Sequence, residues 1–110
     1  MSDESCQEVP DAVMCCDMRG MLSFMILWLL TKEPMHGQQI AEEIAKRRGT
    51  KPSPGTIYPA LKDLTQRGLV QGEKKGRRVT YTLTPRGSQG IDRACHYFCQ
   101  AFQEIFEEYR

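Results

Sequence analysis

The chain has 110 residues, a formal net charge of +1, 40% hydrophobic residues and 26% charged residues. This length accommodates one domain, or one small domain with an oligomerisation element, and the composition is that of a soluble globular protein. These values exclude a disordered chain, a multidomain enzyme and a collagen-like fibre. The longest apolar run, residues 21–30, is too short for a membrane span of about 20 residues, and the first residues are acidic where a signal peptide is basic. We therefore expect a cytoplasmic protein.

The charges are distributed unevenly along the chain. Residues 1–44 carry a net charge of −6, residues 45–87 a net charge of +9, and residues 88–110 a net charge of −2. A basic segment between two acidic ones is typical of a nucleic-acid-binding face. The alternative is a solvated basic face that only keeps the protein soluble.

The first half of the chain predicts a tail followed by two helices. Residues 1–17 are polar and acidic without helical periodicity, so we expect a flexible acidic tail. Residues 18–30 are good helix formers and apolar on nearly every face, which predicts a helix that is buried on more than one side. Residues 35–37 are expected to form a short connector, and residues 38–47 an amphipathic helix that ends at Gly49.

A third helix is predicted to follow and to end at Gly68. Its inward stripe consists of Ile57, Leu61 and Leu64. If Ser53 is the N-cap and Pro54 the first helical residue, Pro59 lies inside the helix and removes a hydrogen bond at a cost of ~3 kcal/mol. If Thr56 is the N-cap, Pro59 lies in the first turn, where its missing N–H costs nothing. We prefer the start at Thr56.

A β-hairpin is predicted after the third helix. Residues 69–73 form the first strand, residues 74–77 a basic turn, and residues 78–83 a second strand with alternating apolar and polar side chains. Residues 84–87 then break the strand. Three helices followed by two strands is the order of a winged helix-turn-helix, which we place at residues 18–87. The predicted fold class is therefore mostly α with a small β-hairpin.

The last predicted element is one long helix over residues 88–110. Its apolar stripe repeats every three or four residues and consists of Ile91, Cys95, Phe98, Phe102, Ile105 and Tyr109. Its mean spacing is the ~3.5-residue period of a helix that pairs with another helix. We therefore predict a C-terminal dimerisation helix. In the alternative interpretation, the stripe packs onto its own domain.

Three stretches of the chain carry a family resemblance. Residues 33–37 (EPMHG), 51–61 (KPSPGTIYPAL) and 83–87 (LTPRG) are similar to motifs of the PadR family of transcriptional regulators, in its short form. The resemblance implies a homodimer that binds double-stranded DNA at a pseudo-palindromic operator and usually represses transcription.

The candidate DNA-binding residues lie on the third helix and on the hairpin. They are Ser53, Gly55, Thr56, Tyr58, Pro59, Lys62, Lys74, Lys75, Arg77 and Arg78. Small residues let a helix approach the DNA closely, hydroxyl groups donate to phosphates, and hairpin cations lie along the backbone or enter the minor groove. For Tyr58, the alternative is a packed helix residue.

The chain contains no enzyme motif, so we predict that it is not an enzyme and requires no cofactor. His36 is interpreted as a hydrogen-bonding turn residue rather than a catalytic base. The candidate ligands for a thiophilic metal or metalloid effector are Cys15, Cys16, Cys95 and Cys99. The alternative is that Cys95 and Cys99 are small apolar residues of the helix seam and that the tail cysteines are inert.

These observations together predict a homodimeric, sequence-specific transcriptional regulator, a repressor that an effector at the dimer interface releases from DNA. Two other functions stay open, namely a winged-helix module that binds another protein and a thiol-based metal or redox sensor. The basic middle between acidic ends favours DNA binding, because a protein-binding module needs no such separation of charge.

Overall fold

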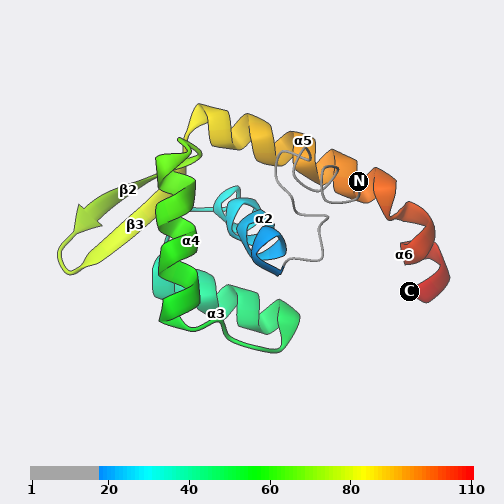
Figure 1. The fold of residues 1–110 in the computed structure, drawn as a ribbon, viewed down its shortest axis with the longest axis horizontal. Coiled ribbons are helices and arrows are strands. Elements are labelled where there is room, and N and C mark those ends of the chain that lie inside the picture. Colours follow the sequence, from blue (N-terminus) through cyan, green and yellow to red (C-terminus); the bar gives the residue numbers. More distant parts are fainter. Residues whose placement is uncertain (1–17) are drawn as a thin grey trace, which may run out of the picture.

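A computed structural model describes residues 18–110 of the chain, and Figure 1 shows the arrangement of their helices and strands. The elements are α2 (Met18–Leu30), β1 (Met35–His36), α3 (Gly37–Arg48), α4 (Pro54–Gln66), β2 (Val70–Lys75), β3 (Arg78–Leu83), α5 (Pro85–Ala101) and α6 (Gln103–Tyr109). The order confirms the predicted fold class, which is mostly α with a winged helix-turn-helix and a C-terminal helical segment. The predicted tail and two candidate metal ligands, Cys15 and Cys16, lie outside the described residues.

Helix α2 forms the centre of the core. It contacts α3, α4, α5 and strand β3, so that three helices surround it (Figure 1). Its side chains Leu22, Ile26 and Leu29 are buried, which agrees with a helix that is apolar on nearly every face. No helix within residues 18–110 is long and apolar enough to cross a membrane.

The sheet has three antiparallel strands in the order β1-β3-β2. The sequence predicted only a connector at residues 35–37, and this prediction was wrong because Met35 and His36 pair with Tyr81 and Thr80 of β3. A two-residue strand is too short to show the alternation by which strands are recognised. Burial of Met35 against the core holds this strand in place.

The hairpin is longer than the sequence predicted. Strand β2 continues to Lys75, which pairs with Arg78, so the turn consists of two residues and not of the predicted four. Gly76 occupies the first of them with a φ of 65°, the left-handed conformation that two-residue hairpin turns require. Lys74 and Lys75 are therefore strand residues and not turn residues.

Helix α4 begins earlier than the preferred prediction. Ser53 is the N-cap and Pro54 the first helical residue, which places Pro59 inside the helix. The first turn forms because the N–H groups of Thr56 and Ile57 both donate to the carbonyl of Ser53. Pro59 has no N–H, so the backbone carbonyl four residues earlier lacks its helical hydrogen bond. This loss is tolerated because Pro59 is exposed and the carbonyl can bind water instead.

The C-terminal segment is two helices and not the single predicted helix over residues 88–110. Helix α5 begins at Pro85, three residues before the predicted start, because the hydroxyl of Thr84 accepts the N–H of Gly87 at 3.0 Å. The helix ends at Phe102, whose φ of −111° and ψ of 14° are not helical. Helix α6 therefore turns away from the axis of α5 (Figure 1).

Candidate nucleic-acid interface

Helix α4 divides its residues between the core and the surface. Ile57, Leu61 and Leu64 are fully buried, as their spacing predicted. The opposite side exposes the predicted DNA contacts of this helix and its N-cap, which are Ser53, Gly55, Thr56, Tyr58, Pro59 and Lys62. One face of α4 is therefore fixed by packing, and the other is free to meet a ligand.

Tyr58 both packs and stays accessible. Its ring lies against Gly37, where an added Cβ would be only 2.6 Å from the ring. The side chain nevertheless remains 47% exposed, so its hydroxyl is available as a donor. A packing role and a DNA contact are thus compatible for Tyr58, because one side of its ring packs against the start of α3 while the rest of the side chain is exposed.

A groove of about 280 Å³ runs between α3 and the start of α4. Its lining includes Gln38 of α3, Lys51 and Pro52 of the connecting loop, and Tyr58 of α4. The groove therefore adds a concave, partly polar surface beside the exposed face of α4.

The β2–β3 hairpin carries four exposed cations, Lys74, Lys75, Arg77 and Arg78. Within residues 18–110, no carboxylate forms an ion pair with any of them. Some of the cations on the helices differ in this respect. Lys46 and Arg47 both bind Glu43, at 3.0 and 2.9 Å, and their hydrogen bonds lower the pKa of that carboxyl group. The hairpin is therefore a part of the described surface where four cations of one short segment have no carboxylate partner.

His36 joins β1 to α3 and reaches the hairpin. Its Nδ1 atom lies 3.2 Å from the backbone nitrogen of Gln39 and accepts its N–H, which caps α3. The predicted hydrogen bonding of His36 is thus confirmed, but the residue makes its bond from strand β1 as the N-cap of α3 and not from a turn. Its Nε2 atom lies 3.1 Å from Nη1 of Arg78, a contact that the sequence analysis missed. Only the pairing of β1 with β3 brings these two residues together, and that pairing leaves no local sequence signal.

The predicted dimerisation stripe is split between the core and the surface. Ile91 is buried in the core, and Cys95 packs partly against it. The ring of Phe98 lies 5.3 Å from that of Phe24 on α2 and 4.9 Å from that of Phe102, measured between centroids. The first half of the stripe thus packs onto its own domain, which was the alternative interpretation.

The second half of the stripe is exposed. Ile105 is 51% exposed and Tyr109 is 83% exposed. Phe106 was not among the predicted stripe residues, yet its ring centroid lies 5.8 Å from that of Phe98. A straight helix would separate positions eight apart by about 12 Å along its axis, so the turn at Phe102 is what brings these rings together.

The two described cysteines are free thiols with different surroundings. Cys95 is half-buried and Cys99 is exposed. Burial raises the pKa of the Cys95 thiol, and the nearby Cys99 and Asp92 raise it further. Within residues 18–110, no group of three or more cysteine, histidine or acidic side chains is placed to hold a metal ion.

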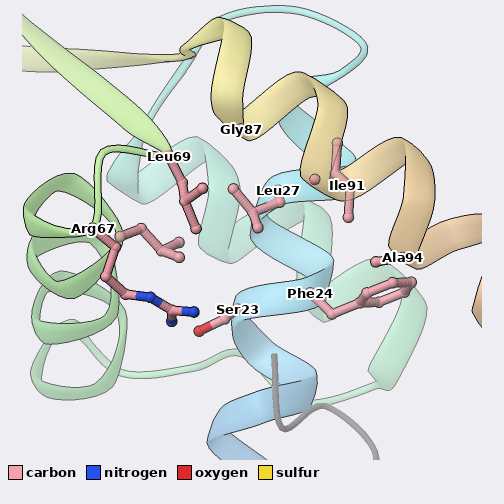
Figure 2. A pocket seen from close by; sticks show the side chains of 10 residues that line it. Ser23, Phe24, Leu27, Arg67, Leu69, Gly87, Ile91 and Ala94 are labelled. Atoms are coloured by element: carbon pink, nitrogen blue, oxygen red, sulfur yellow. The ribbon is translucent and has the colours of Figure 1, made fainter. Parts of the chain in front are cut away.

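A small cavity lies where α2, the end of α4 and the start of α5 meet. Figure 2 shows that Ser23 and the guanidinium of Arg67 point toward one another, and Phe24 and Ile91 also line the cavity. The volume of about 40 Å³ is enough for a few water molecules and far below the ~300–1,000 Å³ of a typical small-molecule site. This cavity is therefore too small for an organic effector.

Comparison with known proteins identifies the family. Residues 26–93 match the transcriptional regulator PadR-like family. The chain is 34% identical over 77 residues to the transcriptional regulator Rv3488 of Mycobacterium tuberculosis, an alignment that covers 66% of this chain and 71% of that relative. It is 32% identical over 76 residues to the transcriptional regulator YqjI of Escherichia coli, covering 66% of this chain and 37% of YqjI.

Several relatives are much longer than the matched region. The chain is 33% identical over 84 residues to an uncharacterized 37.1 kDa protein in transposon TN4556 of Streptomyces fradiae, which covers 76% of this chain and 24% of that protein. The chain thus spans well under half of the length of this relative and of YqjI.

Solved structures show the same fold. A PadR-like transcription factor from Bacteroides fragilis superposes with a TM-score of 0.70 at 25% identity, covering 82% of this chain and 91% of that one. RosR of Halobacterium salinarum superposes with a TM-score of 0.69 at 26% identity, covering 79% of this chain and 86% of RosR. Membership of a regulator family confirms the prediction that the chain is not an enzyme. Because the family match spans more than half of the sequence, this chain belongs to the PadR-like family of transcriptional regulators.

Proposed function

We propose that the chain acts as a homodimer that binds a pseudo-palindromic operator in double-stranded DNA and represses transcription. The observation that carries this proposal is that α4, which exposes one face, packs against β2 of a hairpin whose four cations have no carboxylate partner among the described residues. In this proposal, α4 enters the major groove, where Ser53, Gly55 and Thr56 allow close approach, while the hairpin binds the phosphate backbone.

The exposed apolar end of the chain supports the homodimer. Ile105, Phe106 and Tyr109 are 51%, 39% and 83% exposed, and together they form an apolar surface of a kind that marks interaction sites. A second copy of α6 has the matching chemistry, and a two-fold axis makes the same patch available on both subunits. The dimer would present two α4 helices to half-sites about one helical turn, or ~34 Å, apart.

The test is selection of bound sequences from a random pool of duplex DNA at a fixed salt concentration. We expect enrichment of sequences with two inverted half-sites, and a bound complex that contains two chains. Enrichment of single, asymmetric sites would contradict the homodimer. Absence of any enrichment would contradict the DNA-binding proposal and favour the alternative, a winged-helix module that binds another protein.

The effector stays a prediction. The cavity of about 40 Å³ is too small for an organic effector, whereas the groove of about 280 Å³ beside α4 lies on the face proposed for DNA, so an effector away from that face would need space that a second subunit helps to enclose. The thiol hypothesis has a narrower basis, since only Cys95 and Cys99 of its four candidates are described. DNA-binding titrations with zinc, arsenite or a mild oxidant test it, and unchanged affinity with all three would assign the cysteines to packing.

A further inference from the structure

His36 makes two contacts that one imidazole ring cannot satisfy together. Its Nδ1 atom lies 3.2 Å from the backbone nitrogen of Gln39, and its Nε2 atom lies 3.1 Å from Nη1 of Arg78. A backbone N–H and a guanidinium can only donate hydrogen bonds. A neutral imidazole has one accepting nitrogen, and an imidazolium has none. At least one of the two contacts is therefore a donor facing a donor.

The bond to Gln39 is the one that His36 keeps. It is local and half-buried, and it satisfies one of the N–H groups in the first turn of α3, which have no partner within the helix. The contact with Arg78 joins two groups at the surface, where water competes for both. Nδ1 therefore accepts, the ring proton resides on Nε2, and Nε2–H points at the guanidinium of Arg78.

In the part of the chain that the structure describes, no side chain of the surrounding sheet accepts a hydrogen bond from either of these two donors. Paired residues of neighbouring strands share a face of the sheet, so His36, Thr80 and Glu73 lie on one face, and Arg78 lies two residues from Thr80 on the same face. Among the described residues, no carboxylate, Glu73 included, forms an ion pair with Arg78. The two donor nitrogens are 3.1 Å apart, so one oxygen could accept from both once the Arg78 side chain turns away from the imidazole.

We propose that Nε2–H of His36 and the guanidinium of Arg78 together bind one phosphate group of the DNA backbone. This inference rests on the proposed function and adds His36, which is not among the predicted DNA contacts. A phosphate oxygen replaces the contact between two donors with two bonds to an anion, and it leaves the cap of α3 intact. The next residue, Gly37, supports the ring of Tyr58, so the site is continuous with the exposed face of α4.

The position of the imidazole proton in the free protein is the first test. We expect ¹⁵N NMR of the histidine-labelled chain to show the proton of the His36 ring on Nε2 and none on Nδ1. The opposite tautomer, with the proton on Nδ1, would mean that Arg78 donates to Nε2. The pair would then need no further acceptor, and the proposal would be wrong. This measurement uses the wild-type chain and so requires no variant to fold.

The second test maps contacts phosphate by phosphate. In the duplex selected from the random pool, single phosphates are replaced by uncharged methylphosphonates. We expect the replacement at one position in each half-site to weaken wild-type binding about tenfold, because a lost hydrogen bond to a charged group costs a binding free energy of that order. His36→Asn keeps an oxygen for the cap but cannot reach Arg78, and Arg78→Gln removes the charge. Both variants should be insensitive at that same phosphate, whereas the control Arg77→Gln should remain sensitive there.

The outcomes separate this inference from the proposed function. If wild-type protein binds no duplex, the proposed function fails. In a second outcome, the wild-type protein binds DNA, with one phosphate at which replacement weakens the wild type but not Arg78→Gln. If replacement of that phosphate weakens His36→Asn as much as it weakens the wild type, only the role of His36 is overturned. Inorganic phosphate distinguishes a free anion from the DNA backbone. A shift of the His36 Nε2 signal with inorganic phosphate but not with duplex would overturn the assignment to DNA.

Discussion

The β2–β3 hairpin and helix α6 lie at opposite ends of the molecule and expose opposite chemistry (Figure 1). The hairpin presents cations that have no carboxylate partner among the described residues, and α6 presents Ile105, Phe106 and Tyr109 to solvent. A cationic surface is completed by a polyanion, and an apolar surface by another apolar surface. The two ends therefore require different partners, a polyanion for the hairpin and an apolar surface for α6, whereas the core between them is complete within one chain.

The largest expected effect, on DNA affinity, follows from removing the positive charge of the hairpin. Changing Lys74, Lys75, Arg77 and Arg78 together to glutamine should weaken binding to all duplex sequences alike. The slope of log affinity against log salt should become shallower by about 0.9 for each phosphate that the variant no longer neutralises. Fluorescence anisotropy at several salt concentrations measures both quantities.

A control uses cations that already have carboxylate partners. Lys46→Gln combined with Arg67→Gln removes two positive charges that bind Glu43 and Asp63 in the structure. This double variant should change the slope much less than any two hairpin substitutions. An equal change would show that total charge, and not the unpaired hairpin, determines DNA affinity.

The second prediction separates the dimer contact from the chain's own packing. Ile105→Asp places a charge on the exposed surface of α6, so it should shift sedimentation toward monomer and leave the melting temperature of the monomer nearly unchanged. Phe98→Ala instead removes the ring that contacts Phe24 within one chain, and it should destabilise the fold by about 3 kcal/mol. If Ile105→Asp remains fully dimeric, the subunit contact lies elsewhere than on α6.

A third prediction concerns the joint that sets α5 against the hairpin. An added Cβ at Gly87 would be 1.9 Å from the carbonyl oxygen of Leu69, whereas one at Gly90 meets nothing within 4 Å. Gly87→Ala should therefore destabilise the fold by about 1–3 kcal/mol, because backbone cannot yield as a side chain does. Gly90→Ala should stabilise it by ~0.5–1 kcal/mol, since alanine favours a helix interior. Urea unfolding midpoints compare the two, and equal effects would contradict the close contact.

Sequence periodicity was enough to predict elements that bury one face against the core. The spacing of Ile57, Leu61 and Leu64 indicated the inward side of α4, and the apolar run of residues 18–30 predicted α2 with the bounds that the structure shows. These predictions succeeded because burial of apolar side chains leaves a regular spacing in the sequence.

The failures occurred where distant residues decide the structure. The two-residue strand at Met35 and His36 exists only because β3 lies beside it, and the turn at Phe102 accompanies ring contacts that join α6 back to Phe98. The start of α4 was misplaced because the cost of Pro59 was counted without its exposure to water. In the candidate site, the same limitation hid the contact of His36 with Arg78, which are 42 positions apart.

The smallest expected effect concerns the thiols of α5, of which Cys95 belongs to the packed half of the stripe and Cys99 is exposed. Burial raises the pKa of Cys95, and the thiolate is the form that reacts with alkylating agents. At pH 8, Cys95 should therefore react more slowly with iodoacetamide than an ordinary exposed thiol. The alkylation rate of Cys95 should continue to increase above about pH 8.5, where the rate of an unperturbed thiol levels off.

Peptide mass spectrometry of the wild-type chain follows the alkylation of each cysteine separately. A Cys99→Ser variant is the control, because it removes the neighbour whose charge also raises the pKa of Cys95. Redox sensors depend on thiols with a low pKa, so fast labelling of Cys95 at neutral pH would contradict the packing role and favour a thiol sensor.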